Sequence, residues 1–234
     1  MTLLSVVKDV ASVIGVAQPN TVFGGINSNR TMQEMLSLAN EMAQRIAYDT
    51  REWNALVSLA TYVGDGVTEA FPMPADYKRM LLKSEVWRST SDLQPMSYIP
   101  DINEWIQRRA MSRNTAWGEW IRIGNQMHIW PIMGSDLTAT FAYLNKNCIN
   151  LASGGTGDAF QQDNDSFVLD ERLLKLGMIF QWKANKGSPY SEDMGSYGDA
   201  LMMAMAADSP APTLVGRSTS SRAIRVAYPW PVPT

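Results

Sequence analysis

The chain has 234 residues, of which 45% are hydrophobic, which is enough to build one large or two small globular domains. Its formal net charge of −3 excludes a basic field that would draw the whole surface to nucleic acid or to an anionic membrane. Its longest apolar stretches fall short of the roughly 18 residues that a membrane span needs, so we expect no membrane segment.

Two helices are predicted near the N-terminus. Apolar residues recur at helical spacing from Leu3 to Ile14, and Gly15 follows where a left-handed cap ends a helix. A second apolar stripe, from Met32 to Ile46, predicts a helix that runs to about Tyr48, with Thr31 and Glu34 as the expected capping box.

The middle of the chain is predicted to be rich in β-strands. Gly64, Asp65 and Gly66 lie between two short apolar runs, which predicts a hairpin. A second hairpin is expected to turn at Gly124 and Asn125. The predicted elements are strands at 59–63, 67–71, 80–87 and 137–144, a short helix at 102–110, and the second hairpin at 120–130.

Helices resume after residues 153–165, a polar segment without periodicity that we predict to be an exposed loop. Asp170 is the expected N-cap of a third helix, which Gly187 closes, and a fourth helix is predicted at about 191–207. The methionines of this fourth helix are assigned to core packing or to a subunit interface.

The last segment, 209–234, differs in composition from the rest of the chain. It is rich in proline and carries three arginines but no acidic side chain, whereas residues 158–208 carry nine acidic and four basic side chains. Prolines disfavour a helix or a central strand. The segment is therefore predicted to be an extended arm that reaches onto a different, acidic surface.

Together these elements predict an α+β fold. A helical bundle would be formed by the N-terminal helices (1–52) and the C-terminal loop and helices (153–208). An antiparallel β-domain (53–152) would be inserted between them, and the arm (209–234) would follow.

Few side chains suggest catalysis or metal binding. The only histidine, His128, lies in a predicted strand, where alternation would place it opposite Ile121, Ile123 and Ile129, and no neighbouring residue completes a triad or a zinc site. The only cysteine, Cys148, cannot form an internal disulfide and is expected to be a buried structural thiol.

A group of acidic residues offers oxygen ligands without the glycine and the twelfth-position acid of a calcium loop: Asp163, Asp165, Asp170 and Glu171. We therefore expect no enzymatic activity, no cofactor and no metal.

The arm offers the one group of residues that suggests binding: Arg217, Arg222, Arg225, Tyr228 and Trp230. Three arginines are a small footprint for a nucleic-acid backbone, but that function stays open. Docking as a peptide on a partner protein is favoured, because prolines preorganise an extended chain and lower the cost of ordering it on binding.

Several segments together resemble the phage head-to-tail adaptor, or connector, family. They are 1–7 (MTLLSVV), 47–56 (AYDTREWNAL), 71–80 (FPMPADYKRM), 120–125 (WIRIGN) with Trp130-Pro131 and 141–143 (FAY), 163–177 (DNDSFVLDERLLKLG), 181–187 (QWKANKG) and 190–193 (YSED).

The resemblance implies a bundle with a β-domain, twelve copies in a ring below the portal, and an arm that engages the portal protein. It also implies contacts with tail or nozzle proteins, a place in the neck of the virion, synthesis in the host cytoplasm, and DNA passing through the channel without sequence-specific binding. The alternatives are a nucleic-acid-binding virion accessory protein or another neck or tail completion protein.

Overall fold

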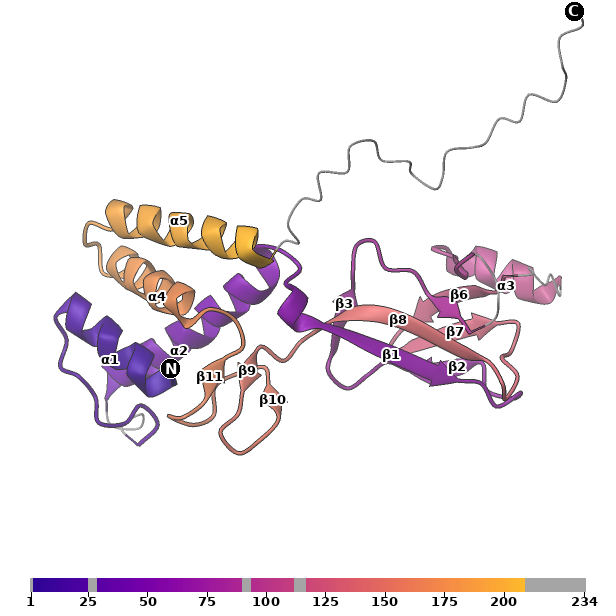
Figure 1. The fold of residues 1–234 in the computed structure, drawn as a ribbon, viewed down its shortest axis with the longest axis horizontal. Coiled ribbons are helices and arrows are strands. Elements are labelled where there is room, and N and C mark those ends of the chain that lie inside the picture. The colour runs from indigo at the N-terminus through magenta and orange to yellow at the C-terminus, as the bar shows by residue number, and fades with distance from the viewer. Residues whose placement is uncertain (1, 25–28, 90–93, 112–116, 209–234) are drawn as a thin grey trace, which may run out of the picture.

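The computed structural model describes residues 2–24, 29–89, 94–111 and 117–208 (Figure 1). Four long helices gather at one end of the molecule, and most strands gather at the other end with one further helix (Figure 1). The predicted class of mixed helices and antiparallel sheets is confirmed.

Five α-helices are described, and four of them belong to the helical end. They are α1 (Leu3–Ile14), α2 (Arg30–Gln44), α3 (Ile102–Ala110), α4 (Glu171–Asn185) and α5 (Ser191–Asp208). A π-helical turn, η1 (Arg45–Asp49), continues α2, and a 3-10 turn, η2 (Asn54–Leu56), leads into the first strand.

Side-chain caps explain where the helices begin. Asp170 caps α4 as predicted, and Gly15 ends α1 in the left-handed conformation with φ 75°. The predicted capping box of Thr31 and Glu34 is wrong. Asn29 is the cap of α2, because its side chain accepts the N–H of Thr31 at 3.0 Å.

The helical core is built around α4, which contacts α1, α2 and α5. Its members include Leu3, Met35, Met42, Leu174 and Met178, all buried. The close approach of α4 to α2 depends on Gly177, because a Cβ at this position would lie 2.5 Å from the Cε of Met42.

The described residues form three sheets. The first contains β1 (Val57–Val63), β8 (Thr138–Asn145), β3 (Tyr77–Met80) and β4 (Trp87–Arg88). The second contains β2 (Ala70–Pro72), β7 (Gln126–Trp130), β6 (Glu119–Ile123) and β5 (Ser97–Tyr98), with β5 parallel to β6. The third contains β10 (Thr156–Gly157), β9 (Ile149–Asn150) and β11 (Ser166–Phe167), and it packs on the helical core.

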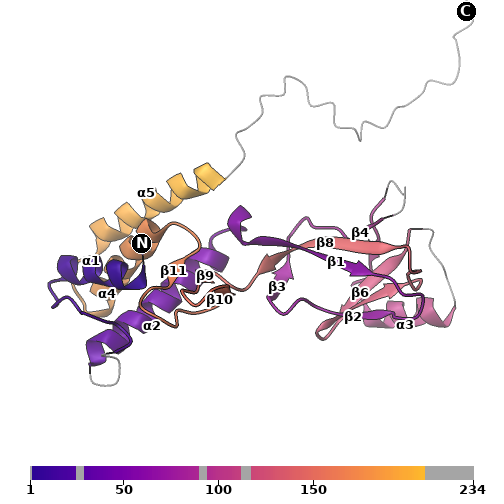
Figure 2. The same cartoon turned by 60° about the horizontal axis from the view of Figure 1, so that its bottom comes forward.

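The first two sheets enclose a separate core that includes Phe71, Met127, Ile129 and Phe141. Helix α3 lies on the side of the second sheet away from β1 and β8 (Figure 2). Its buried Trp105 packs there with other apolar side chains. The predicted helix at 102–110, the hairpin at 120–130 and the strand at 137–144 are all confirmed.

The predicted hairpin at Gly64, Asp65 and Gly66 is wrong. Strand β1 pairs with β8 along its whole length, and β2 pairs with β7 in the other sheet. At these glycines the chain crosses from the first sheet to the second. The N–H of Gly64 donates to the carbonyl of Leu137 at 2.8 Å, and the N–H of Gly66 donates to the carbonyl of Met133 at 2.9 Å.

The predicted strand at 80–87 is wrong over most of its length. Strand β3 ends at Met80, β4 begins at Trp87, and between them a turn closes with the N–H of Ser84 donating to the carbonyl of Leu81. The segment 153–165 is not wholly exposed, since Phe160 and Asp165 are buried. The polar composition of the segment predicted exposure throughout. The carboxylate of Asp165 is nevertheless buried, and its hydrogen-bonding capacity is satisfied by backbone N–H groups.

The tight crossing after β1 gives a test of the fold. We expect Gly64→Ala to lower the free energy of unfolding by about 2 kcal/mol or more, because its Cβ would overlap the backbone carbonyl of Gly134. Gly195→Ala, in an open position of α5, should instead stabilise by up to about 1 kcal/mol. Urea unfolding of both variants measures the two changes in the free energy of unfolding. Equal changes would contradict the close approach of Gly64 to the backbone of Gly134.

Candidate protein interaction surfaces

The predicted arm residues Arg217, Arg222, Arg225, Tyr228 and Trp230 lie outside the described residues. The structure does place the residue from which the arm starts. Asp208, the last residue of α5, accepts the N–H of Asn54 at 3.2 Å, and its carboxylate lies 3.2 Å from the Nη2 of Arg51. The end of α5 is therefore fixed where the helices meet the beginning of β1 (Figure 1).

A groove of about 530 Å³ lies on the outer face of the first sheet. We call it the sheet groove and define it by Leu59, Leu81, Leu82, Trp87, Thr140 and Ala142. Pairing of Leu59 with Ala142 and of Trp87 with Thr140 places these side chains on one face. Leu59 is 72% exposed, Leu82 85% and Trp87 46%.

The sheet groove is apolar but has charged residues at its edge. Glu52, Lys83 and Glu85 contribute to its lining, and Glu52 is held by an ion pair with Arg79 and by the N–H of Leu82 at 3.0 Å. Large exposed apolar groups that gather on one face are typical of protein-binding surfaces. Sequence reasoning missed this groove, because only strand pairing brings its residues together.

A second apolar surface lies on α5. Met202 and Met203 are exposed by 63% and 71%, and we call these two residues the α5 face. The opposite side of α5 is anchored to α4, because Tyr197 packs against Phe180 with ring centroids 5.1 Å apart. The packing of α5 is thus complete without the α5 face, which leaves these methionines available to a partner.

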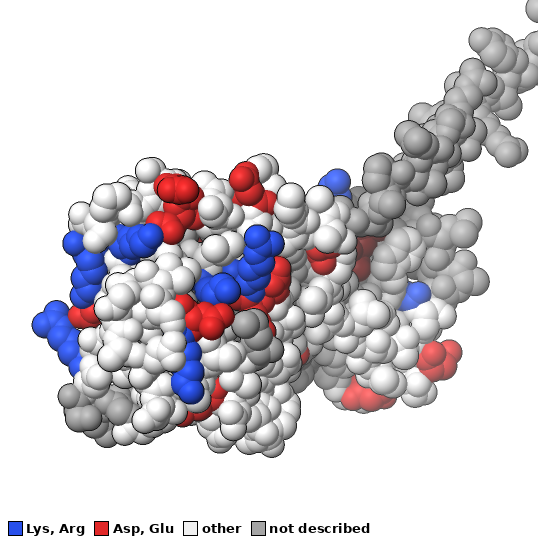
Figure 3. All heavy atoms as spheres, turned by 60° about the vertical axis from the view of Figure 1, so that its left-hand side comes forward, with Lys and Arg blue, Asp and Glu red and all other residues white. Residues whose placement is uncertain are grey.

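Charges at the helical end are paired rather than gathered by sign. Lys175 lies 3.4 Å from Asp9, Lys183 2.7 Å from Asp193, and Lys186 2.6 Å from Glu34. Figure 3 shows this end of the molecule, with basic and acidic groups beside one another. The described helical surface visible there therefore lacks the continuous basic stripe typical of nucleic-acid binding.

His128 lies on the same face as Ile121 and Ile123, so its predicted placement opposite these residues is wrong. The reason is that Ile121 pairs directly with His128 across the antiparallel hairpin, and directly paired residues share a face. The predicted placement opposite Ile129 is correct, since neighbouring residues alternate.

His128 lies beside a structural ion pair, which is formed by Glu69 and Arg109. Its Nδ1 lies 4.0 Å from the carboxylate of Glu69, which in turn lies 2.8 Å from the guanidinium of Arg109. Arg109 stacks on Trp130 at 3.9 Å. These contacts join α3 to the second sheet and give the histidine a packing function.

Cys148 is fully buried beside Tyr48, as expected for a structural thiol. Burial raises the pKa of the Cys148 thiol, which disfavours the thiolate that a nucleophile or metal ligand needs. Burial also raises the pKa of Tyr48, whose hydroxyl donates to the carbonyl of Lys146. This pair therefore favours the neutral forms of both groups.

The acidic residues considered for calcium organise the backbone instead. Asp165 is fully buried and accepts the N–H groups of Ala152 at 2.8 Å, Gln161 at 2.6 Å and Gln162 at 2.7 Å. Asp163 accepts the hydroxyl of Thr21 and the N–H of Val22 at 2.9 Å.

The environment of Asp163 favours its charged form. Burial acts to raise the pKa of Asp163, but hydrogen bonds from Thr21 and from the backbone of the neighbouring loop outweigh it and lower the pKa. Within 2–24, 29–89, 94–111 and 117–208, no three His, Cys, Asp or Glu side chains are grouped as metal ligands.

Comparison with protein families and with curated proteins identifies no relative of this chain. No protein-family model matches the chain, and no curated protein matches it. In the part of the chain that the structure describes, no helix has both the length and the apolar character needed to cross a membrane.

The buried carboxylate of Asp165 provides a test. Asp165→Ala should destabilise the protein by about 3 kcal/mol, because three N–H groups lose their acceptor in a buried loop. Asp158→Ala, an exposed change in the same segment, should stay within about 0.5 kcal/mol of the wild type. Thermal and urea unfolding give both values, and a wild-type stability for Asp165→Ala would contradict its structural function.

Proposed function

We propose that the chain is a structural head-to-tail adaptor of a tailed phage and not an enzyme. Twelve copies form a ring in the neck of the virion, which joins the portal protein to tail or nozzle proteins and continues the DNA channel. DNA passes through this channel without sequence-specific binding. The resemblance of the sequence to the adaptor family and the two apolar surfaces support the proposal.

The observation that carries the proposal is that one copy exposes two different apolar surfaces. The α5 face belongs to the helical end, and the sheet groove belongs to the first sheet. Contacts between unlike surfaces are heterologous, and repeated heterologous contacts form a ring when their rotation closes. A protein that used a single surface twice would form only a symmetric pair.

In this proposal the fold is a helical bundle built by both ends of the chain, with a β-domain inserted. The sharing of one core by α1, α2, α4 and α5 supports this interpretation, as does the course of β1 and β8, which lead from the helical end into the β-rich end (Figure 1). The bundle supplies the α5 face, and the β-domain supplies the sheet groove. Neighbouring copies then contact each other through both parts.

The arm, 209–234, binds the portal in this proposal through Arg217, Arg222, Arg225, Tyr228 and Trp230. A single arm contributes little affinity. In a ring the effect multiplies, because once one arm has docked the others bind at high effective concentration.

Deletion of 209–234 tests the function of the arm. The truncated protein should lose binding to the portal but keep its fold, because the described cores lie within residues 2–208. Co-sedimentation with the portal and circular dichroism give the two measurements. Unchanged attachment would refute the arm's function.

A salt titration of the full-length protein separates peptide docking from nucleic-acid binding. Docking through proline, tyrosine and tryptophan should weaken little between 50 and 200 mM salt, whereas binding that depends on phosphate contacts should weaken steeply. Tight, steeply salt-dependent binding to DNA, with none to the portal, would favour the alternative of a nucleic-acid-binding accessory protein.

The α5 face is tested by a double substitution, Met202→Glu with Met203→Glu. Both side chains are exposed in one copy, so the stability should change by less than about 0.5 kcal/mol per site, whereas ring formation should be lost because two charges would enter an apolar contact. Native mass spectrometry and electron micrographs, with and without portal, measure the assembly.

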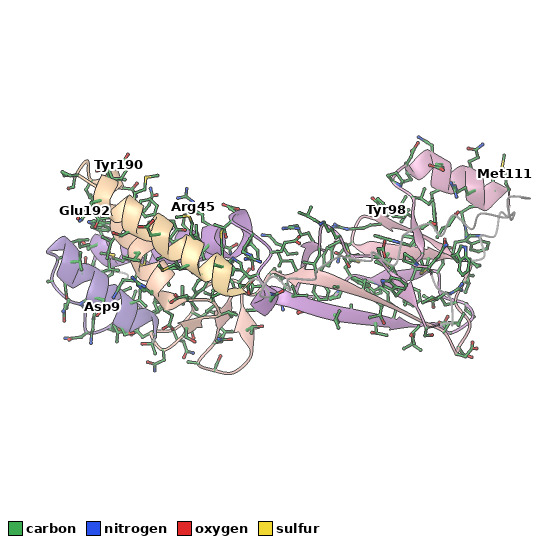
Figure 4. All side chains as sticks on the ribbon, turned by 45° about the horizontal axis from the view of Figure 1, so that its top comes forward. Asp9, Arg45, Tyr98, Met111, Tyr190 and Glu192 are labelled. Carbon is green, nitrogen blue, oxygen red and sulfur yellow. The ribbon has the colours of Figure 1, made fainter. Side chains whose placement is uncertain are left out.

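The matched control for this double substitution is Met111→Glu. Met111 is also exposed but lies at the other end of the molecule from α5 (Figure 4). It should leave the assembly intact. Rings of wild-type size from the double variant would exclude the α5 face as a contact between copies.

A further inference from the structure

Strand β1 forms an open edge of the first sheet. Among the described residues it pairs with β8 alone, in an unbroken register from Val57 to Val63. In such a pair, about half of the backbone N–H and C=O groups of the edge strand point away from its partner. Strand β1 therefore presents a row of backbone groups to a further strand.

This edge lacks the features that usually protect an edge strand from pairing. Native edges carry charged side chains, prolines or bulges, or they are very short. The seven residues of β1, VSLATYV, include no charged residue and no proline, and their pairing with β8 has no bulge. Leu59 and Val63 also expose apolar side chains, by 72% and 62%. An edge of this kind is suited to being covered by another strand.

The end of α5 brings the rest of the chain to this edge. Asp208 is held by Asn54, three residues before β1 begins at Val57. The 26 residues of 209–234 therefore start beside one end of the open strand. They are also the longest segment outside the described residues.

One part of the arm has the sequence of a strand. Residues 222–228, RAIRVAY, contain no proline and alternate, with Ile224, Val226 and Tyr228 on one side. These three residue types favour strands, and Pro229 follows where a strand would end. The segment is as long as β1.

The remaining linker is long enough to reach the edge. Residues 209–221 can span roughly 40 Å at about 3.3 Å per residue, whereas a seven-residue strand is only about 23 Å long. Either end of β1 is therefore within reach from Asp208.

We propose that residues 222–228 add to the open edge of β1 in the same chain. Main-chain hydrogen bonds supply the pairing, and Ile224, Val226 and Tyr228 can cover Leu59 or Val63 as cross-strand neighbours. Because the segment is tethered, its effective concentration at β1 is in the millimolar range and favours its own chain over other copies.

The pairing rests on the proposed function in one respect, which is that the same arm engages the portal. The free protein holds its arm on β1, and the arm leaves this edge when it engages the portal.

Hydrogen exchange of the full-length protein without portal tests the pairing. Val226→Pro removes a backbone donor and breaks the added strand. We expect the β1 amides that face away from β8 to exchange at least about tenfold faster in this variant, while the β8 amides stay unchanged. Ser218→Pro, in the linker, is the matched control and should leave the exchange of β1 as in the wild type.

Two outcomes would overturn the inference. Equal exchange of β1 in the wild type and in Val226→Pro would show that the segment does not cover this edge. Slow exchange that disappears on dilution would show pairing between copies instead of within one chain. Portal binding is measured separately on the same samples, so a protected β1 without portal binding would refute the proposed function and leave the pairing standing.

Discussion

The β1–β8 ladder is the constraint on which the rest of the structure depends. Leu144, which pairs with Val57, is buried in the helical core, whereas Ala139 and Phe141 of the same strand are buried between the sheets. One hydrogen-bonded pair of strands thus takes part in both cores. The helices and the sheets are therefore joined by shared packing and not only by a connecting segment. In the proposed ring, this shared ladder would set the distance between the α5 face and the sheet groove.

Most elements specified by nearby residues were predictable, although the cap of α2 was not, and those specified by distant partners were missed. The caps of α1 and α4, helix α3 and the β6–β7 hairpin depend on contacts within a few turns or one tight loop, and their patterns predicted them correctly. The hairpin expected at Gly64 failed because the partner of β1 lies some eighty residues later in the chain. The burial of Asp165 was missed for a similar reason, since its donors come from both ends of a polar loop.

The candidate surfaces show the same limit. Leu59, Leu82 and Trp87 look like ordinary strand or turn residues in the sequence, and only the pairing of β1 and β4 with β8 places Leu59 and Trp87 on one exposed face. The methionines of α5 were assigned to core or interface, and helical spacing alone could not choose between them. The arm was predicted from composition, because a proline-rich and arginine-bearing segment is not expected to bury enough apolar area to join a core, and it lies outside the described residues. Its portal-binding function stays a prediction.

The π-helical turn at the end of α2 has a consequence for the tolerated length of the chain. In η1 the carbonyl of Ile46 accepts from both the Thr50 hydroxyl and the Trp53 indole N–H, each at 2.7 Å, and this fixes how the chain leaves the helix. Loss of one residue from Arg45–Asp49 would convert the turn to ordinary α-helix and rotate the chain beyond it by about 100°. Buried Trp53 would then lose its site, because the chain would leave the helix in another direction. Homologous chains should therefore vary in the length of their loops but not in this segment.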